Sequence, residues 1–190
     1  MEEKHFEGDV FTQIDFTRER LTESKYDNCS FVKCSFADSH LSNSDFIECE
    51  FKDCDLSNAQ IKNTAFKDVK FADCKMLGLN FAECKPFLLA LGLSGCQLRL
   101  SSFYKLKLKN IKFTNCSLQE VDFTEADLTN SLFDNCDLSR ALFENTILEK
   151  ADFRTSYNYS IDPEINLIRK AKFSKMGIEG LLDKHDIEIE

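Results

Sequence analysis

Large apolar residues recur at every fifth position over most of this chain. Phe46, Phe51 and Leu56 are a typical stretch, and a small Ser or Cys stands two positions before each of them. A period of five is neither the 3.6-residue period of an α-helix nor the two-residue period of a β-strand. It indicates an internal repeat in which each pentapeptide is one structural unit.

The repeat forms two runs. The first consists of Phe6, Phe11, Phe16, Leu21, Tyr26, Phe31, Phe36, Leu41, Phe46, Phe51, Leu56, Ile61, Phe66, Phe71, Met76 and Phe81. The second consists of Leu98, Phe103, Leu108, Phe113, Leu118, Phe123, Leu128, Phe133, Leu138, Phe143, Leu148 and Phe153. Of the 18 phenylalanines, two lie outside these runs, Phe87 and Phe173.

The cysteines give the number of pentapeptides in one coil. Twenty residues separate Cys34, Cys54 and Cys74, and again Cys96, Cys116 and Cys136. Twenty residues are four pentapeptides, so like residues stack if each coil has four faces. The pattern predicts a four-sided all-β helix, with the large residue and the small residue of each pentapeptide pointing inward. At the usual spacing of about 4.8 Å between strands, the two runs make a rod roughly 34 Å long.

Several segments match a known motif closely. They are Ala126-Asp127-Leu128-Thr129-Asn130, Cys136-Asp137-Leu138-Ser139-Arg140 and Ala151-Asp152-Phe153-Arg154-Thr155. The chain resembles the pentapeptide-repeat family, whose motif is Ala-(Asp/Asn)-Leu-X-X. This resemblance covers residues 4–155 and implies a right-handed quadrilateral β-helix. We expect the β-helix to occupy residues 1–155 and a C-terminal cap to occupy residues 156–190.

All nine cysteines occupy the inward small position of a pentapeptide. Free cysteine behaves as a small buried apolar residue, and parallel side chains in a ladder lack the crossing geometry of a disulfide. No CxxC pair or paired histidines accompany them, as a zinc site would require. We therefore expect reduced core thiols, with no metal and no cofactor. No Ser/His/Asp set or glycine-rich phosphate loop is present either, so the sequence does not indicate an enzyme.

The length and composition favour a single domain. The chain has 190 residues with two prolines and six glycines, and no linker divides it. No apolar run approaches the roughly 20 residues of a membrane span. The charged start does not have the pattern of a signal peptide. We expect a cytoplasmic protein without a membrane contact.

The repeat is interrupted at residues 84–95, where its register shifts by two. A proline and two glycines indicate a bulge or a short loop at a coil corner, and the stretch from Pro86 to Leu98 has no charged residue. On one interpretation the segment is a register adjustment that packs on the core. On the other it is an apolar contact for a partner, as in topoisomerase-binding members of the family, whose coils are interrupted by loops. The residues of this contact would be Pro86, Phe87, Leu88 and Leu89.

The motif fades after Phe153. We expect Pro163 to halt the coil and residues 165–173 to cover the open end, because an open end exposes a sheet edge. The apolar spacing in residues 175–185 is typical of a short helix, and Ile187 and Ile189 alternate with acids as in a strand. The element resembles the C-terminal helix and strand through which Qnr-type proteins dimerise; the alternative is a cap alone. This resemblance implies a homodimer contact made by Met176, Ile178, Leu181, Leu182, Ile187 and Ile189.

The net charge of −9 is unevenly distributed, since residues 84–113 contain six bases and no acid. A stride of twenty places opposite charges side by side. Each such cross-strand pair contributes only about 0.2–1 kcal/mol. The predicted pairs are Lys105–Glu125, Lys107–Asp127, Glu50–Lys70 and Asp55–Lys75.

Two predicted stacks join like charges. Glu48 lies over Asp68 and Asp53 over Asp73, an arrangement that is mildly destabilising. Two acidic stripes on adjacent corners could imitate the phosphate lines of duplex DNA, which carries one charge per about 1.7 Å of axis. The basic middle of the chain argues against a uniform imitation of DNA.

Two functional hypotheses follow. The acidic rod, together with the resemblance to Qnr-type and microcin-immunity members of the family, implies a non-catalytic DNA mimic. It would bind DNA gyrase or topoisomerase IV, would not bind nucleic acid itself, and would protect the enzyme from quinolone or toxin poisoning. The alternative is a scaffold whose apolar break binds an unrelated cytoplasmic protein.

Overall fold

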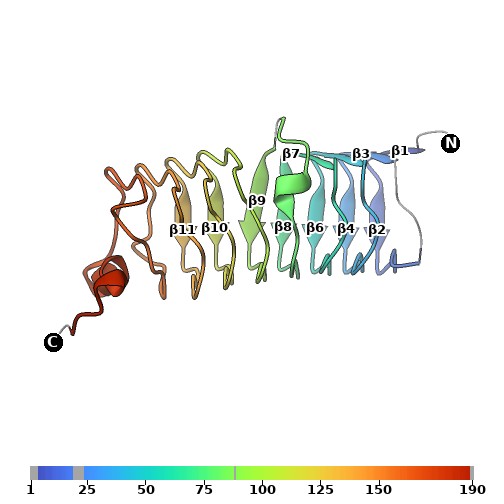
Figure 1. Ribbon diagram of the computed structural model, residues 1–190. Helices are drawn as coiled ribbons and strands as arrows, with labels where there is room; N and C mark the ends of the chain where they lie inside the picture. Colours follow the sequence, from blue (N-terminus) through green and yellow to red (C-terminus); the bar gives the residue numbers. More distant parts are fainter. Residues whose placement is uncertain (1–3, 19–23, 88, 189–190) are drawn as a thin grey trace.

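The chain winds into a parallel β-solenoid whose coils stack along a rod (Figure 1). The structure is a computed structural model that describes residues 4–18, 24–87 and 89–188. The N-terminus lies at one end of the rod and the C-terminus at the other. The prediction of an all-β quadrilateral β-helix is confirmed. Three residues named above, Leu21, Leu88 and Ile189, lie outside the described residues.

The regular elements are short. The strands are β1 (Lys4–Glu7), β2 (Val10–Thr12), β3 (Ser24–Asp27), β4 (Ser30–Val32), β5 (Asp45–Ile47), β6 (Glu50–Lys52), β7 (Ala65–Lys67), β8 (Val69–Ala72), β9 (Leu91–Ser94), β10 (Lys112–Thr114) and β11 (Leu132–Asp134). The 3-10 helices are η1 (Phe81–Glu83), η2 (Lys175–Leu181) and η3 (Asp183–His185). No helix in the part of the chain that the structure describes is long and apolar enough to cross a membrane.

Parallel pairing joins each coil to the next. One sheet has the order β1-β3-β5-β7, and the other has the order β11-β10-β9-β8-β6-β4-β2. Isolated parallel bridges form the other two faces, as between Ser35 and Asp55, and continue the face of the first sheet beyond the break, as between Lys107 and Asp127. Partners are twenty residues apart, except across the break, where Val69 pairs with Leu91. The predicted register shift of two residues is therefore confirmed.

A left-handed backbone conformation recurs at the corners of the coils. Positive φ angles appear at every fifth position over long stretches, from Gln13 (φ 55°) near the N-terminus to Lys170 (φ 60°). Asn and Asp adopt this conformation more readily than other residues with a side chain, because their short polar groups hydrogen-bond locally. Stacked asparagines also pair across coils: Asn135 Nδ2 donates to Asn115 Oδ1 at 2.7 Å. The corner position thus favours Asn and Asp, although it also accepts residues such as Lys33 and Leu100.

Aromatic rings fill the interior in register. Phe31 stacks on Phe51 with ring centroids 4.6 Å apart, one coil to the next. Within one coil, neighbouring rings meet edge to face, as Phe46 and Phe51 do at 5.4 Å. These rings are fully buried. The five-residue period read from the sequence is therefore the period of the core.

The cysteines line the inside of the coils. Cys34, Cys54, Cys74, Cys96, Cys116 and Cys136 follow one column, and all nine cysteines are free and buried. Each thiol in this column donates to a backbone carbonyl; Cys54 Sγ, for example, lies 3.3 Å from the oxygen of Phe31. Burial raises the pKa of the Cys49 thiol to about 11. The predicted core position of the thiols is confirmed, and burial disfavours the thiolate form of Cys49.

The coil continues beyond residue 155. Asp152 bridges to Lys172, and Phe173, which lies outside the two runs, stacks on Phe153 at 5.4 Å. The prediction that Pro163 halts the coil is wrong. Pairing resumes because Asn166 fills the next inward position, where its Nδ2 donates to the carbonyl oxygen of Phe143 at 2.7 Å. A buried amide thus replaces the usual small residue.

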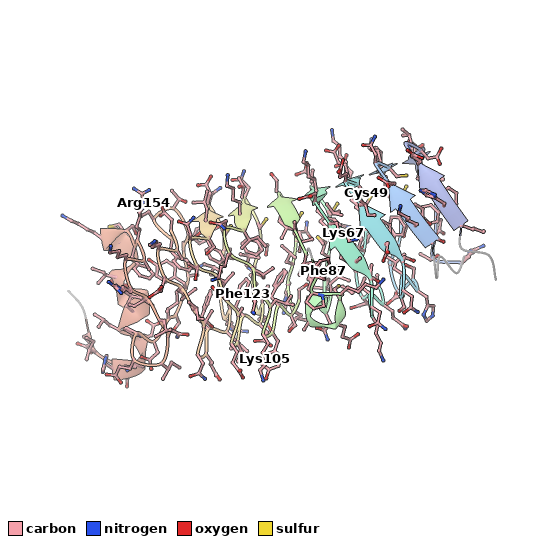
Figure 2. All side chains as sticks on the ribbon, turned by 90° about the horizontal axis from the view of Figure 1, so that it is seen from above. Cys49, Lys67, Phe87, Lys105, Phe123 and Arg154 are labelled. Carbon is pink, nitrogen blue, oxygen red and sulfur yellow. The ribbon has the colours of Figure 1, made fainter. Side chains whose placement is uncertain are left out.

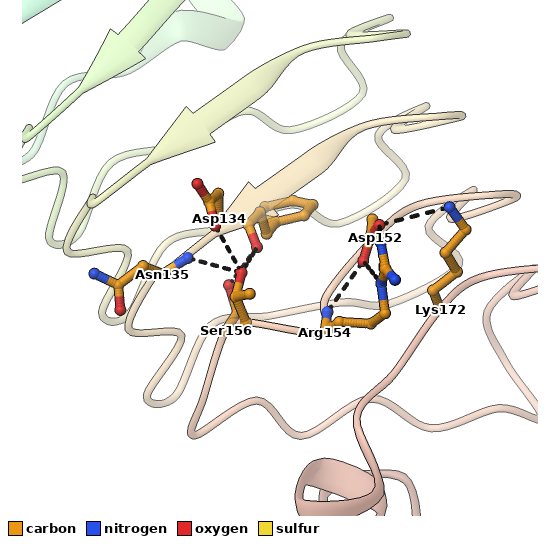
Figure 3. Close-up of polar contacts among 8 residues, drawn as sticks. Asp134, Asn135, Asp152, Arg154, Ser156 and Lys172 are labelled. Atoms are coloured by element: carbon orange, nitrogen blue, oxygen red, sulfur yellow. Dashed lines mark hydrogen bonds and ion pairs between the residues drawn. The ribbon is translucent and has the colours of Figure 1, made fainter.

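Polar side chains hold these last coils together (Figure 3). Asp152 accepts a hydrogen bond from Arg154 Nη2 at 2.7 Å and lies 3.6 Å from Lys172 Nζ. The Arg154 hydrogen bond lowers the pKa of the Asp152 carboxyl. On the adjacent face, Ser156 Oγ donates to the carbonyl oxygen of Phe133 at 2.7 Å.

The C-terminal cap consists of η2 and η3. Gly177 and Gly180 lie against Tyr159 so closely that a Cβ atom at either glycine would collide with it. The amide of Ile161 donates to the carbonyl oxygen of Gly180 at 2.8 Å. The predicted terminal strand does not form at Ile187, because a left-handed Asp186 (φ 48°) at the end of η3 interrupts an extended backbone just before it. Ile189 lies outside the described residues.

Candidate interaction surface

The four carboxylates singled out in the sequence occupy two neighbouring corners of the solenoid. All four are exposed and have positive φ angles: Glu48 (52°), Asp53 (53°), Asp68 (53°) and Asp73 (55°). The pairing of Ile47 with Lys67 and of Lys52 with Ala72 places Glu48 beside Asp68 and Asp53 beside Asp73. The predicted stacking of like charges is therefore present.

The backbone explains part of this composition. A left-handed corner favours Asp or Asn, and equivalent corners do carry Asn58 and Asn63. Asparagine would satisfy the conformation without adding charge, and a glutamate such as Glu48 has no particular preference for it. The corner geometry thus accounts for the short polar side chains but not for the negative charge.

Each acidic stripe is only two carboxylates long. The stripe of Glu48 and Asp68 is preceded by Asn28 and followed by Ala90 in the neighbouring coils. The second stripe ends where Asp73 meets Gly95. At about 4.8 Å per coil, these stripes cover a small fraction of the rod. They form an acidic patch at one place rather than two continuous lines of charge.

Gly95 makes room for the end of the second stripe. It has a φ of +66°, and a Cβ atom there would collide with Asp73 Oδ1. We expect Gly95→Ala to lower the free energy of unfolding by about 2 kcal/mol or more, because left-handed strain adds to the collision. Urea denaturation followed by circular dichroism measures this change.

The same substitution in an Asp73→Ala background is the control. There the collision is absent, so we expect only the conformational cost of about 1–2 kcal/mol to remain. Equal losses in both backgrounds would show that the Asp73 side chain moves aside without cost.

Two shallow depressions follow the first acidic stripe. The larger, about 470 Å³, is lined by Asn28, Cys29, Ser30, Glu48, Cys49, Glu50, Asp68 and Lys70. A second, about 200 Å³, is lined by Asp68, Val69, Lys70, Ala90, Leu91 and Gly92. Asp68 and Lys70 belong to both. The acidic corner and the end of the register break therefore adjoin each other on one surface.

The register break projects from the side of the rod (Figure 1). Near its start the amide of Lys85 donates to the oxygen of Thr64 at 2.9 Å, and the amide of Ala90 returns the chain to the coil by donating to the oxygen of Phe66 at 3.1 Å. The Lys85 side chain also forms an ion pair with Asp45, two coils away, at 2.7 Å. Both ends of the loop are thus fixed to the preceding coil.

The two interpretations of the break apply to different residues. Leu89 is half-buried and packs against the core, as expected for a register adjustment. Phe87 is 75% exposed near the middle of the rod (Figure 2), and Pro86 is also exposed. Leu88 lies outside the described residues. Pro86 and Phe87 are thus exposed to a partner, and Phe87 offers the larger apolar surface.

The basic middle of the chain is largely neutralised by the next coil. Ion pairs join Arg99 to Glu120 at 2.7 Å, Lys105 to Glu125 at 3.3 Å and Lys109 to Asp127 at 3.3 Å. The predicted Lys105–Glu125 pair is confirmed, whereas Asp127 pairs with Lys109 instead of Lys107. Although the backbone bridge places Lys107 beside Asp127, the long, exposed side chain of Lys109 also reaches this carboxylate.

The other two predicted pairs are side by side without forming ion pairs. Glu50 pairs with Lys70 through the backbone, and Asp55 bridges to Lys75. Among the described residues, neither pair brings nitrogen and oxygen within 4.0 Å. Exposed side chains gain too little from such contacts to hold one geometry.

The residues proposed for dimerisation divide into two groups. Met176 is 90% exposed, and Ile178 and Ile187 are about half exposed. Leu181 packs against the core and Leu182 is half-buried, so these two hold the cap in place. The exposed three are apolar and lie in the C-terminal end of the chain.

Comparison with known proteins gives one family. The family model described as "Pentapeptide repeat region" matches residues 22–86, 44–123 and 90–159. No curated protein matches the chain.

Solved structures give similar folds. Full-length QnrB1, described as a plasmid-mediated fluoroquinolone resistance protein, is 16% identical, with a TM-score of 0.57 over 96% of this chain and 100% of that one. A trypsin-treated variant of QnrB1 is 18% identical, with a TM-score of 0.52 over the full length of both chains. HetL, from the cyanobacterium Nostoc sp. strain PCC 7120, is 14% identical, with a TM-score of 0.39 over 90% of this chain and 87% of that one.

Proposed function

This chain belongs to the pentapeptide-repeat family, and from that premise we propose that it is a non-catalytic, cytoplasmic binding protein for a type II topoisomerase. Its partner would be DNA gyrase or topoisomerase IV. By occupying the surface that otherwise holds DNA, it would lower the amount of drug- or toxin-trapped cleavage complex. No covalent step is involved, so protection is a competition between two ligands for one surface.

The observation that carries this proposal is the acidic patch of Glu48, Asp53, Asp68 and Asp73 beside an exposed aromatic loop. A surface that binds DNA phosphates is rich in Lys and Arg. Carboxylates on a rigid solenoid complement such a surface without an ordering cost, and they accelerate association. Phe87 adds an exposed aromatic contact beside the carboxylates, which make the larger contribution in this proposal.

The similarity to QnrB1 supports the same proposal. Its described role is fluoroquinolone resistance, and this chain shares its fold over nearly the full length of both chains. The short acidic stripes modify the DNA-mimic model, since they supply one anionic patch rather than a duplex-length pattern. We therefore assign binding to the patch and the loop together.

A homodimer through the C-terminal cap would lengthen the binding rod. Met176, Ile178 and Ile187 are apolar, exposed and close in the chain, and burying them against a second copy would remove them from water. Two copies joined at this end would present two acidic patches to a symmetric enzyme.

A second candidate function rests on Phe87 alone. Its 75% exposure at a fixed loop fits a scaffold that binds an unrelated cytoplasmic protein through an apolar pocket on that protein. This candidate does not need the acidic patch.

A gyrase supercoiling and cleavage assay tests the proposal. The protein is titrated into reactions that contain a fluoroquinolone, and both supercoiled product and cleaved DNA are measured on the same gel. We expect supercoiling to recover and cleaved DNA to fall as the protein is added. Neither protection nor inhibition over a broad titration, with gyrase and with topoisomerase IV, would refute the topoisomerase proposal.

A further inference from the structure

The first coil differs from its neighbour at the inward small positions. Lys4 pairs with Ser24 of the second coil. Because Val10 pairs with Ser30, the preceding residue Asp9 lies beside Cys29. Ser24 and Cys29 are buried, at 4% and 2% exposure, whereas Lys4 and Asp9 are exposed. The columns that hold small buried residues in the second coil therefore begin with charges of both signs.

This end of the rod would otherwise be well suited to association. β1 and β2 are the outermost strands of their sheets (Figure 1), and Phe6 and Phe11 are only partly buried there. Val10 is 69% exposed. An open edge with apolar residues is a ready template for pairing with another chain.

Within the described part of the chain, the edge also has backbone groups without a hydrogen-bond partner. In the second coil, the amides of Ser30 and Ser35 donate to the oxygens of Asp9 and Ile14, both at 2.9 Å. By the twenty-residue repeat, the amides of Val10 and Asp15 point the same way, out of the open end. They are the donors that a stacked coil would use.

We propose that Lys4 and Asp9 prevent the N-terminal end from stacking on the open end of a second copy of this chain. A coil stacked there would enclose both side chains in the columns that run down to Ser24 and Cys29. Enclosing a charge without a partner is strongly unfavourable. Among the described residues neither Lys4 nor Asp9 has an ion-pair partner within its own chain.

The consequence is a rod that can associate at one end only. If both ends were adhesive, copies would add without limit and form filaments, whereas a single self-complementary end closes at a dimer. Inward-pointing charges are a known protection of sheet edges. This inference does not depend on any topoisomerase partner.

The double variant Lys4→Ser, Asp9→Ser tests the proposal. It keeps the net charge and gives the first coil small polar residues like those of the second. By sedimentation equilibrium we expect it to self-associate about tenfold more tightly than the parent, or tighter still. Hydrogen exchange should show the amides of Val10 and Asp15 becoming protected as its concentration rises.

A matched control is Glu7→Ser, Arg18→Ser. It removes one charge of each sign from exposed positions of the same coil that do not point inward, so we expect parental association. Hydrogen exchange at the amide of Val10 distinguishes association at the N-terminal end from dimerisation at the cap, because a dimer formed at the cap leaves this amide unprotected. Unchanged mass and exchange in the Lys4→Ser, Asp9→Ser variant would overturn the proposal. So would protection of Val10 with rising concentration in the parent.

Discussion

Phe51→Ala is expected to lower the free energy of unfolding by about 3–5 kcal/mol. The ring is fully buried and stacks between Phe31, at 4.6 Å, and Phe71, at 4.9 Å. Its removal leaves a cavity. The cavity cannot close, because ladders of backbone hydrogen bonds hold the surrounding coil in place. Urea denaturation with circular dichroism measures the loss.

The effect should also spread along the rod. In a solenoid each coil contacts only its neighbours, so a weak coil at the centre divides the cooperative unit. Phe87→Ala is the control, since this phenylalanine is 75% exposed and outside the stacks. We expect its effect to stay within about 0.5 kcal/mol. A similar loss for both substitutions would contradict the packing assigned to the core.

Neutralising the acidic patch should weaken topoisomerase binding about tenfold or more. The variant carries Glu48→Gln, Asp53→Asn, Asp68→Asn and Asp73→Asn. Exposed charges contribute about 0.2–1 kcal/mol each, and every 1.4 kcal/mol is a factor of about ten in affinity. We expect the association rate to fall and its salt dependence to weaken, as measured by surface plasmon resonance.

A second quadruple variant separates local from overall charge. Glu7→Gln, Glu144→Gln, Glu149→Gln and Glu188→Gln removes the same charge outside the acidic patch. It should bind nearly as the parent does. Equal weakening by both variants would mean that overall charge, not the patch, controls association.

Phe87→Asp distinguishes the two candidate functions. The scaffold candidate expects this change to abolish partner binding while the patch variant binds normally. The topoisomerase proposal expects the patch variant to lose more. Because Lys85 and Ala90 fix both ends of the loop, Phe87→Asp should leave the fold intact.

The repeat made the core predictable from the sequence. Residues such as Phe51 and Cys54 recur every twenty positions, so many coils specify the same inward columns. The register shift at the break was predictable for the same reason, since the apolar positions of the second run are offset by two residues from those of the first. The left-handed corner was not predicted, although the frequent Asn and Asp at this position of the repeat were its visible signal.

The candidate site was less predictable. The proximity of Asp68 to the end of the break loop depends on how the chain re-enters the coil at Ala90. The choice of Lys109 over Lys107 by Asp127 depends on the reach of exposed side chains. Neither contact is repeated along the chain, so no periodic pattern in the sequence could predict it.

The sequence by itself determined the coil: four pentapeptides per turn, large apolar residues inside, and buried cysteines in columns. Only the tertiary structure decided where the coil ends, how the cap is built and how far the acidic stripes extend. Periodic positions are specified many times over by stacking between equivalent residues. The ends are specified once, by single contacts such as Asn166 with Phe143 and Tyr159 with Gly180.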